Sequence, residues 1–333
     1  APVVSNGRLF VDDTDAVVYA FDAATGDKIW SQSLRQSGEN SAILFGGGVA
    51  ADGNSVYATD GLGDVVALDA ATGAERWRVR PAGPLRGSPT ISNNNIYVMS
   101  QDNQIFAIDP ATGKTNWNKS GTIGQAGIFG VAAPAAAQGT VIAGYSTGEL
   151  AAYRYENGQD LWTDALSRTS ISTSVSSLTD IDADPVIDRG RVYAIGQGGR
   201  MAAYELISGQ RIWEINIAGI ATPVVAGDWV FVLTDDAKLL AVARTTGKIR
   251  WVAQLPEYRN EEKKKDPIDW KGPVLAGGRL IVANTRGGIW SVDPQSGTTA
   301  QLFEVKEAVS VAPIVANQTL YILDDGGRIS AYR

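Results

Sequence analysis

An eleven-residue stretch recurs along this chain and constrains its fold more than any other feature. Its first copy, AFDAATGDKIW, occupies residues 20–30, and six further copies begin at intervals of 38 to 51 residues. The shared pattern is A-x-D-x-x-T-G-x-x-x-W, in which a strand-like apolar start is followed by a polar turn. Glycine adopts positive φ at little cost, so each copy predicts a β-hairpin whose second strand ends on tryptophan. The tryptophans of the six complete copies are Trp30, Trp77, Trp117, Trp162, Trp213 and Trp251.

The aspartate and the tryptophan of the repeat both have structural explanations. Asp22, Asp69 and Asp109 can accept backbone N–H bonds inside their turns, so we interpret them as turn formers and not as catalytic acids. A tryptophan offers a large flat apolar surface that a neighbouring repeat can cover. We therefore expect the six tryptophans, called the repeat tryptophans below, to dock each repeat onto the next.

A proline forms a second landmark at the start of each repeat. In six repeats it precedes the turn glycine by 24 residues, as Pro2 precedes Gly26. In the second repeat Gly48 replaces the proline and precedes Gly73 by 25 residues. Proline is tolerated at the start of a strand, where its missing N–H costs little. The constant spacing indicates units of fixed length joined by connections of variable length.

Each unit contains four short strand-like segments, which are PVV, RLFV, VVYAF and KIWSQ in the first copy. Four antiparallel strands at a period near 40 to 45 residues are typical of a β-propeller blade. Seven units are complete, and an eighth begins at Pro313. We predict an all-β, eight-bladed β-propeller of four-stranded antiparallel blades that forms a single domain over residues 1–333. The predicted blades are approximately 1–36, 42–82, 84–120, 131–167, 182–218, 221–256, 271–306 and 309–333.

The eighth unit is shorter than the others. Its turn glycine would fall at position 337, whereas the sequence given ends at Arg333. We therefore expect this sequence to supply three strands to the last blade. Either a closing outer strand lies upstream of Ala1, which we favour, or the blade is left with three strands.

Composition excludes several classes of function. The net charge is −7, from 29 Lys and Arg against 36 Asp and Glu, which argues against nucleic acid as a partner. Cysteine and histidine are both absent, which removes thiolate nucleophiles and the commonest general base and metal ligand. No run of 18 apolar residues predicts a membrane span. We expect no catalytic residue, no metal site and no bound cofactor.

Three links between units are long, at residues 118–133, 164–184 and 252–272. The first two flank the fourth unit, so we expect them to be spatial neighbours and to carry binding residues. The alternative is that they cap the central channel with their apolar residues packed inward. The third link carries a charge run from Glu261 to Lys265, which predicts a solvated loop or helical turn. The two links together carry an apolar patch beside an acidic cluster on an exposed loop: Ile123, Ile128, Phe129, Ile171, Val175 and Leu178 beside Asp180, Asp182 and Asp184. Of these, the five predicted partner-binding residues are Ile128, Phe129, Leu178, Asp180 and Asp182.

The repeats resemble those of the quinoprotein superfamily, in which this pattern is called the tryptophan-docking motif. Within it, the segment SSLTDIDADPVIDRGRVYA at 176–194 resembles the BamB family, lipoproteins of the machinery that assembles outer-membrane β-barrel proteins. In that family two aspartates of this segment bind the barrel-forming subunit, and Asp180 and Asp182 occupy their positions. The family's second contact, Leu-x-Leu-Arg, maps onto residues 126–129, where Ile128 matches in type and the arginine has no counterpart.

The resemblance implies a monomeric, non-enzymatic scaffold that binds the periplasmic domains of the barrel-forming subunit and, in addition, unfolded outer-membrane proteins. It also implies a location at the periplasmic face of the outer membrane of a Gram-negative bacterium. An N-terminal lipid outside the given sequence would provide the anchor.

Two other classes of function stay open. A quinone-dependent dehydrogenase of the superfamily would carry pyrroloquinoline quinone, a Ca²⁺ ion, a catalytic aspartate and commonly a vicinal cysteine pair, and this chain has no cysteine. A peptide- or carbohydrate-binding propeller would gather aromatic residues at the channel mouth. The tryptophans outside the repeat pattern are Trp229, Trp270 and Trp290, for which packing within blades or loops is the alternative.

Overall fold

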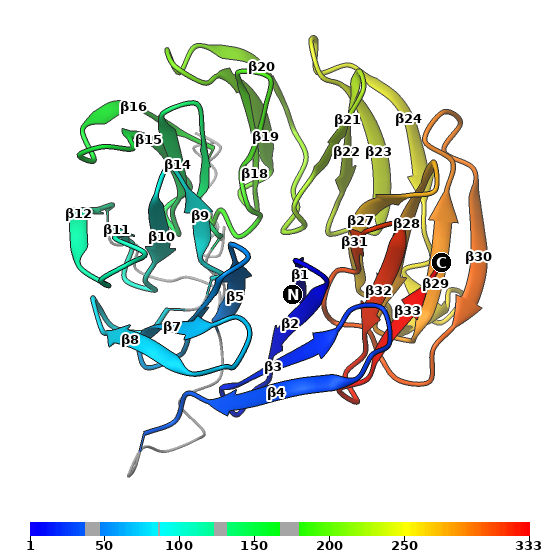
Figure 1. Cartoon of the computed structure of the whole chain (residues 1–333). Coiled ribbons are helices and arrows are strands. Elements are labelled where there is room, and N and C mark those ends of the chain that lie inside the picture. The colour runs from blue at the N-terminus through cyan, green and yellow to red at the C-terminus, as the bar shows by residue number, and fades with distance from the viewer. Residues whose placement is uncertain (37–46, 86, 123–131, 167–179) are drawn as a thin grey trace. The chain divides into compact units, whose positions relative to one another are not determined.

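The computed structural model of residues 1–333 describes all but residues 37–46, 86, 123–131 and 167–179 (Figure 1). The described chain forms eight antiparallel sheets, each built from strands that are consecutive in sequence, and one small hairpin. Seven sheets have four strands and the last has three. The described residues contain no helix of the length and apolarity needed to cross a membrane.

The strands of the first four sheets are β1 (Val3–Ser5), β2 (Arg8–Asp12), β3 (Val17–Asp22), β4 (Lys28–Ser33), β5 (Gly48–Ala51), β6 (Ser55–Thr59), β7 (Val65–Asp69), β8 (Glu75–Val79), β9 (Thr90–Ser92), β10 (Asn95–Met99), β11 (Gln104–Ile108), β12 (Thr115–Ser120), β13 (Ala135–Ala137), β14 (Thr140–Gly144), β15 (Glu149–Arg154) and β16 (Asp160–Ala165). Those of the last four sheets are β17 (Val186–Asp188), β18 (Arg191–Gly196), β19 (Arg200–Glu205), β20 (Arg211–Ile215), β21 (Val224–Ala226), β22 (Trp229–Leu233), β23 (Lys238–Ala243), β24 (Ile249–Gln254), β27 (Trp270–Ala276), β28 (Arg279–Asn284), β29 (Gly288–Val292), β30 (Thr299–Glu304), β31 (Ile314–Ala316), β32 (Thr319–Leu323) and β33 (Ile329–Tyr332).

These sheets are the predicted blades, numbered one to eight in chain order below. The fold class is therefore confirmed: the chain is all-β and has the eight blades of a β-propeller. Blade eight has the three strands expected from the sequence, β31 to β33. That residues 1–333 form a single domain stays a prediction.

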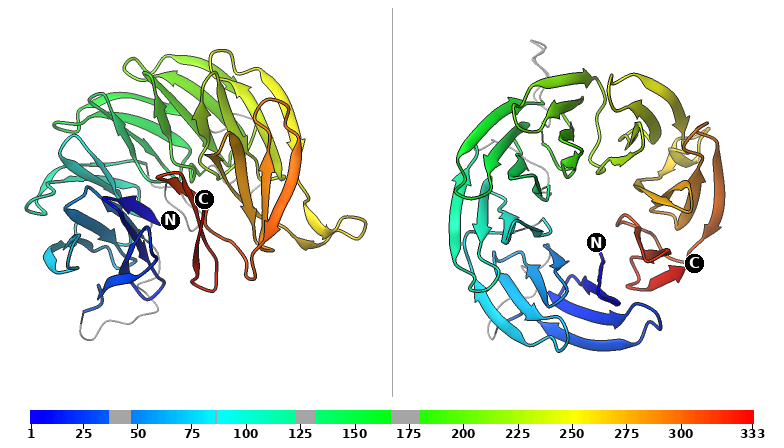
Figure 2. Two further views of the ribbon diagram at one scale, coloured as in Figure 1. Left: turned by 45° about the vertical axis from the view of Figure 1, so that its right-hand side comes forward. Right: turned by 45° about the horizontal axis from the view of Figure 1, so that its top comes forward.

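The described chain divides into two compact units. The first contains blades one to four together with Asp180–Asp182 and Ile207–Gly209, and the second contains the rest of blades five to eight. Within the first unit, β1 contacts β5, β5 contacts β9 and β9 contacts β13. Within the second, β17 contacts β21, β21 contacts β27 and β27 contacts β31. Figure 2 shows the blades of each unit following one another in chain order.

The middle strands of the blades form the core. All five residues of β6 and β10 are buried, because blades two and three are each covered by a neighbouring blade of the first unit on both faces. Both faces of such a strand must then be largely apolar, as in other sheets that are buried on both sides. The fourth strands differ, since in β12 only Trp117 is buried while both of its sequence neighbours are exposed.

Trp117 illustrates how the repeat tryptophans contact the following blade. Its indole N–H donates to the Tyr155 carbonyl oxygen at 2.8 Å. Its ring covers Gly158, where an added Cβ would lie 2.7 Å from the ring. Gly158 has a φ of +68°, so both space and backbone conformation favour glycine there. Equivalent indole bonds run from Trp30 to Ala70, Trp77 to Pro110, Trp213 to Arg244 and Trp251 to Pro294, and the ring of Trp162 covers Gly209.

The turn-forming role of the repeat aspartates is confirmed. One oxygen of Asp109 accepts the backbone N–H groups of Ala111 and Thr112, both at 2.9 Å. Asp22 and Asp69 make the same pair of bonds in their own turns. The carboxylates are thus used inside the hairpins.

The charge run of the third long link lies on a β-hairpin formed by β25 (Tyr258–Asn260) and β26 (Lys265–Pro267). Its tip, residues 261–264, is exposed, as expected for a solvated loop, whereas the alternative of a helical turn is wrong. The Asn260 side-chain oxygen accepts the Lys263 N–H at 2.9 Å, which closes the turn without helical bonds.

Candidate functional site

Two of the five predicted partner-binding residues belong to the described chain. Asp180 and Asp182 lie on the segment that leads from blade four to blade five. Ile128, Phe129 and Leu178 lie outside the described residues, together with much of both links that flank blade four. The expected apolar half of the patch and the expected proximity of the two links therefore stay predictions.

Ile181 fixes this segment against the end of β14. Its side chain is 1% exposed, and its N–H donates to the Tyr145 carbonyl oxygen at 3.2 Å. Gly144 provides the space, because a Cβ there would lie 2.5 Å from Ile181 Cγ2. The segment is therefore packed onto blade four.

The expectation that both aspartates lie on an exposed loop is wrong for Asp180. That residue is 1% exposed, because the segment lies close against the blade and the carboxylate is covered. Asp182 is partly buried, and its neighbour Ala183 is 1% exposed. Asp182 is thus the more accessible of the two predicted contacts. Farther along the segment, the Asp184 N–H donates to Thr222 Oγ1 at 3.2 Å.

Ile181 belongs to a pattern that sequence reasoning missed. In three links, the residue four positions before the landmark proline is apolar and at most 1% exposed: Leu85, Ile181 and Val309. We call these the plug residues. Each donates its N–H to the first residue of the preceding blade's central turn: Asp60, Tyr145 and Asn284, at 3.1 to 3.2 Å. The constant spacing to proline was the signal that would have found them.

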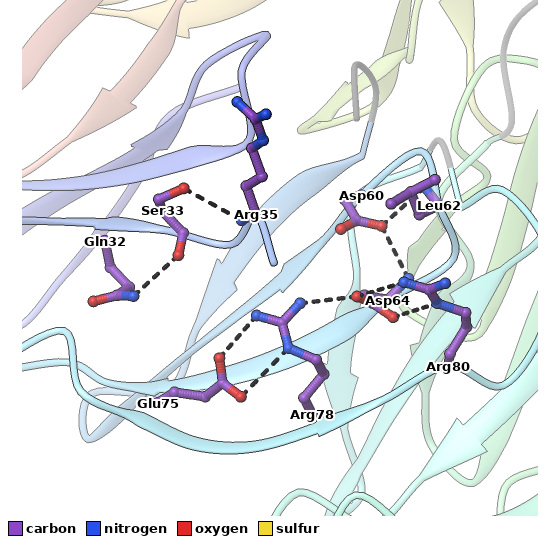
Figure 3. Close-up of polar contacts among 9 residues, drawn as sticks. All are labelled: Gln32, Ser33, Arg35, Asp60, Leu62, Asp64, Glu75, Arg78 and Arg80. Atoms are coloured by element: carbon purple, nitrogen blue, oxygen red, sulfur yellow. Dashed lines mark hydrogen bonds and ion pairs between the residues drawn. The ribbon is translucent and has the colours of Figure 1, made fainter. Parts of the chain in front are cut away.

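Blade two contains a cluster of acidic and arginine side chains around the buried Asp64 carboxylate (Figure 3). Arg78 lies between the carboxylates of Glu75 and Asp64, at 2.8 Å from each. Arg80 Nε reaches the other oxygen of Asp64 at 2.6 Å. Burial raises the pKa of the Asp64 carboxyl, but the hydrogen bonds from Arg80 and Arg78 outweigh it, so the pKa is lowered. Asp64 is therefore held ionised as the centre of the cluster.

Asp60 lies beside this cluster in a different electrostatic environment. It is fully buried, and one oxygen accepts the N–H groups of Leu62 and Asp64 at 2.9 and 3.0 Å. Its other oxygen, Oδ2, has no hydrogen-bond partner in the described structure. Burial raises the pKa of the Asp60 carboxyl, and the nearby Asp64 carboxylate raises it further. Ionised Asp60 is thus less stable in the folded state than in the unfolded state.

This pKa shift predicts a pH-dependent effect of Asp60→Asn. A carboxyl with a raised folded-state pKa favours folding below its unfolded value, near 3.8, and that contribution is lost as the pH rises through the folded pKa. Asparagine does not titrate and keeps the oxygen that accepts both N–H bonds. The stability of the variant relative to the wild type should therefore increase from pH 4 upward, measured by urea denaturation across pH. A difference that is constant with pH would contradict the assignment.

The tryptophans outside the repeat pattern pack within the second unit, as the alternative expected. The Trp229 ring lies 4.9 Å from the Arg250 guanidinium carbon. Trp270 contacts Trp290 edge-on, with ring centroids 5.6 Å apart, and its indole N–H donates to the Pro256 carbonyl at 2.8 Å. Trp270 also lines a pocket considered below. Among the described residues, no group of three or more acidic side chains is arranged to hold a metal ion.

Comparison with known proteins assigns the family. The family model described as "Outer membrane protein assembly factor BamB" matches residues 1–44 and 14–253. The protein of that name from Salmonella typhimurium is 32% identical over 99% of this chain and 83% of its own length. The Escherichia coli K12 protein is 30% identical over 98% and 82%. The crystal structure of BamB from Moraxella catarrhalis matches with a TM-score of 0.85 at 22% identity, covering 99% of this chain and 95% of that one, and so shares the fold. The chain belongs to the family of the outer membrane protein assembly factor BamB.

Proposed function

We propose that this protein is a non-enzymatic scaffold of outer-membrane β-barrel assembly and binds the periplasmic domains of the barrel-forming subunit. The observation that carries the proposal is family membership over almost the whole chain, at 32% identity to a named assembly factor. Its place is the periplasmic face of the outer membrane, with a lipid anchor attached upstream of the given sequence. The absence of histidine and cysteine from the sequence supports a binding role over catalysis.

Asp182 is the proposed charged contact with the partner. Asp182 is partly buried, and buried Ile181 and Ala183 flank it, so the backbone on both sides is held in place. A carboxylate held in this way forms a charge-assisted hydrogen bond with an arginine or lysine at little entropic cost. Buried Asp180 has a positioning role in the same segment. The apolar contacts proposed at Ile128, Phe129 and Leu178 would complete the patch.

The test of this function is Asp182→Arg. An arginine would face the basic group of the partner with like charge, so we expect affinity for the periplasmic domains of the barrel-forming subunit to fall at least about tenfold. Isothermal titration calorimetry on folded protein measures the change. Unchanged affinity would contradict the proposed contact.

The matched control is the double variant Lys263→Glu, Lys264→Glu at the exposed tip of the β25–β26 hairpin. It reverses charge away from the segment of Asp182, and it should leave affinity within about twofold of the wild type, as surface changes away from an interface usually do. Loss of binding in this control alone would move the contact to the hairpin.

A further inference from the structure

A pocket of about 410 Å³ lies wholly within the second unit. Its floor is apolar, formed by Leu233 and Ala237 around the end of β22 and by Trp270 at the start of β27, all buried. Ile220, on the link before blade six, lines it while 43% exposed. Its volume lies within the range of pockets that bind small molecules.

The pocket lies beside a link that lacks a plug residue. Asp269 stands four positions before Pro273, where three other links place Leu85, Ile181 or Val309. Its N–H donates to Thr285 Oγ1 at 3.1 Å, in the blade that follows, and not to the blade that precedes it. Asp269 is exposed at the rim of the pocket. This link therefore has no apolar side chain at the position that a plug residue occupies in the three other links.

Charged groups at the rim have no ionic partner of their own. Within the described residues, Asp235, Asp269 and Lys271 make no ion pair within 4.0 Å, although all three line the pocket. Gln197 also lines it, and its Oε1 accepts no hydrogen bond from the described chain. Two carboxylates and an amide oxygen therefore offer acceptors, against one ammonium group.

We propose that this pocket binds an arginine side chain of a polypeptide segment, which deepens the proposed function by adding a second contact to a protein-binding scaffold. The aliphatic stem and the flat guanidinium would cover Ile220 and Trp270, and the N–H groups would face Asp235 and Asp269. Arginine suits the site because its guanidinium is planar, weakly hydrated and carries five donors. Desolvation also raises the pKa of the Asp235 carboxyl, and a bound cation would relieve that cost.

Lys271 distinguishes binding of a cation from binding of an anion in this pocket. Its ammonium adds one positive charge to a rim that otherwise carries two negative charges, so it opposes a bound cation and would favour a bound anion. Replacing Lys271 should therefore strengthen binding of arginine and weaken binding of a carboxylate. A polar rim around an apolar centre is the usual arrangement of a protein–protein contact.

The test uses the tripeptide acetyl-Leu-Arg-Leu-amide with the full chain, followed by NMR through the Trp270 indole and Gln197 amide signals. The peptide in which citrulline replaces arginine is an isosteric, uncharged control. We expect the arginine peptide to bind at least about tenfold more tightly than the citrulline peptide. Equal affinity of the two peptides, or tighter binding of acetyl-Leu-Glu-Leu-amide, would overturn the proposal.

Three variants test the binding of the arginine peptide independently. Asp235→Asn should weaken binding of the arginine peptide about tenfold, and Lys271→Met should strengthen it. Asp269→Leu restores an apolar plug residue and should abolish binding while the melting temperature stays equal or rises. Unchanged affinity in both Asp235→Asn and Asp269→Leu would overturn the proposal. The barrel-forming subunit is absent from this experiment. A negative result with the peptides therefore does not contradict the Asp182 contact, and a negative result for Asp182→Arg does not contradict binding of arginine in the pocket.

Discussion

Trp117→Ala is expected to lower the free energy of unfolding by about 3 to 5 kcal/mol, the usual range for truncating a buried tryptophan. Trp117 is 7% exposed, and its ring lies 5.9 Å from the Tyr97 ring and 6.1 Å from the Tyr153 ring. The substitution opens a cavity between blades three and four and leaves the Tyr155 carbonyl without its indole donor. Urea denaturation followed by circular dichroism measures the loss.

The matched control is Trp229→Ala. This tryptophan is partly exposed and contacts the Arg250 guanidinium, so its removal leaves a smaller cavity. We expect a loss of about 1 kcal/mol, the centre of the range for point substitutions. If Trp117→Ala kept wild-type stability and lost partner binding instead, the structural role of the repeat tryptophans would be wrong.

Asp64→Asn is expected to cost about 3 kcal/mol, the lower end of the range for breaking a buried ion pair. The Asp64 side chain is 2% exposed, and its two oxygens accept bonds from Arg78 and Arg80. Glu75 still pairs with Arg78 in the variant, which keeps the cost at the lower end. Because the pKa of Asp64 is lowered on folding, its contribution is present above the unfolded value near 3.8 and is lost as the pH falls through the folded value.

An exposed ion pair provides the comparison. Lys119 and Asp160 lie 3.2 Å apart with side chains 33% and 65% exposed. Asp160→Asn should cost less than about 1 kcal/mol at neutral pH, as surface pairs usually do. Thermal and urea denaturation of both variants at pH 7 measure the two losses of unfolding free energy. Equal losses would show that burial does not strengthen the ion pairs of Asp64.

The sequence determined the local units of this protein. The Asp109 turn and the glycine at 158 follow rules that act within a few residues, and so the hairpins, the blade count and the three strands of blade eight were all predictable. The family resemblance, carried by the repeats and by residues 176–194, was confirmed by relatives that cover almost the whole chain.

Tertiary structure alone decided which side chains are buried and which charges meet. Asp180 reads as an exposed loop residue in sequence, but the segment that carries it is packed against Gly144 and Tyr145, some 35 residues earlier. The pairing of β7 with β8 brings Asp64 near Arg78 and Arg80, but only the tertiary structure buries the Asp64 carboxylate. The pocket beside Asp269 depends on an apolar residue that is missing from this link and present in three others. Burial and electrostatic interactions depend on distances in space. A repeat pattern specifies these distances between neighbouring strands of a blade, but it does not specify them for the links between blades.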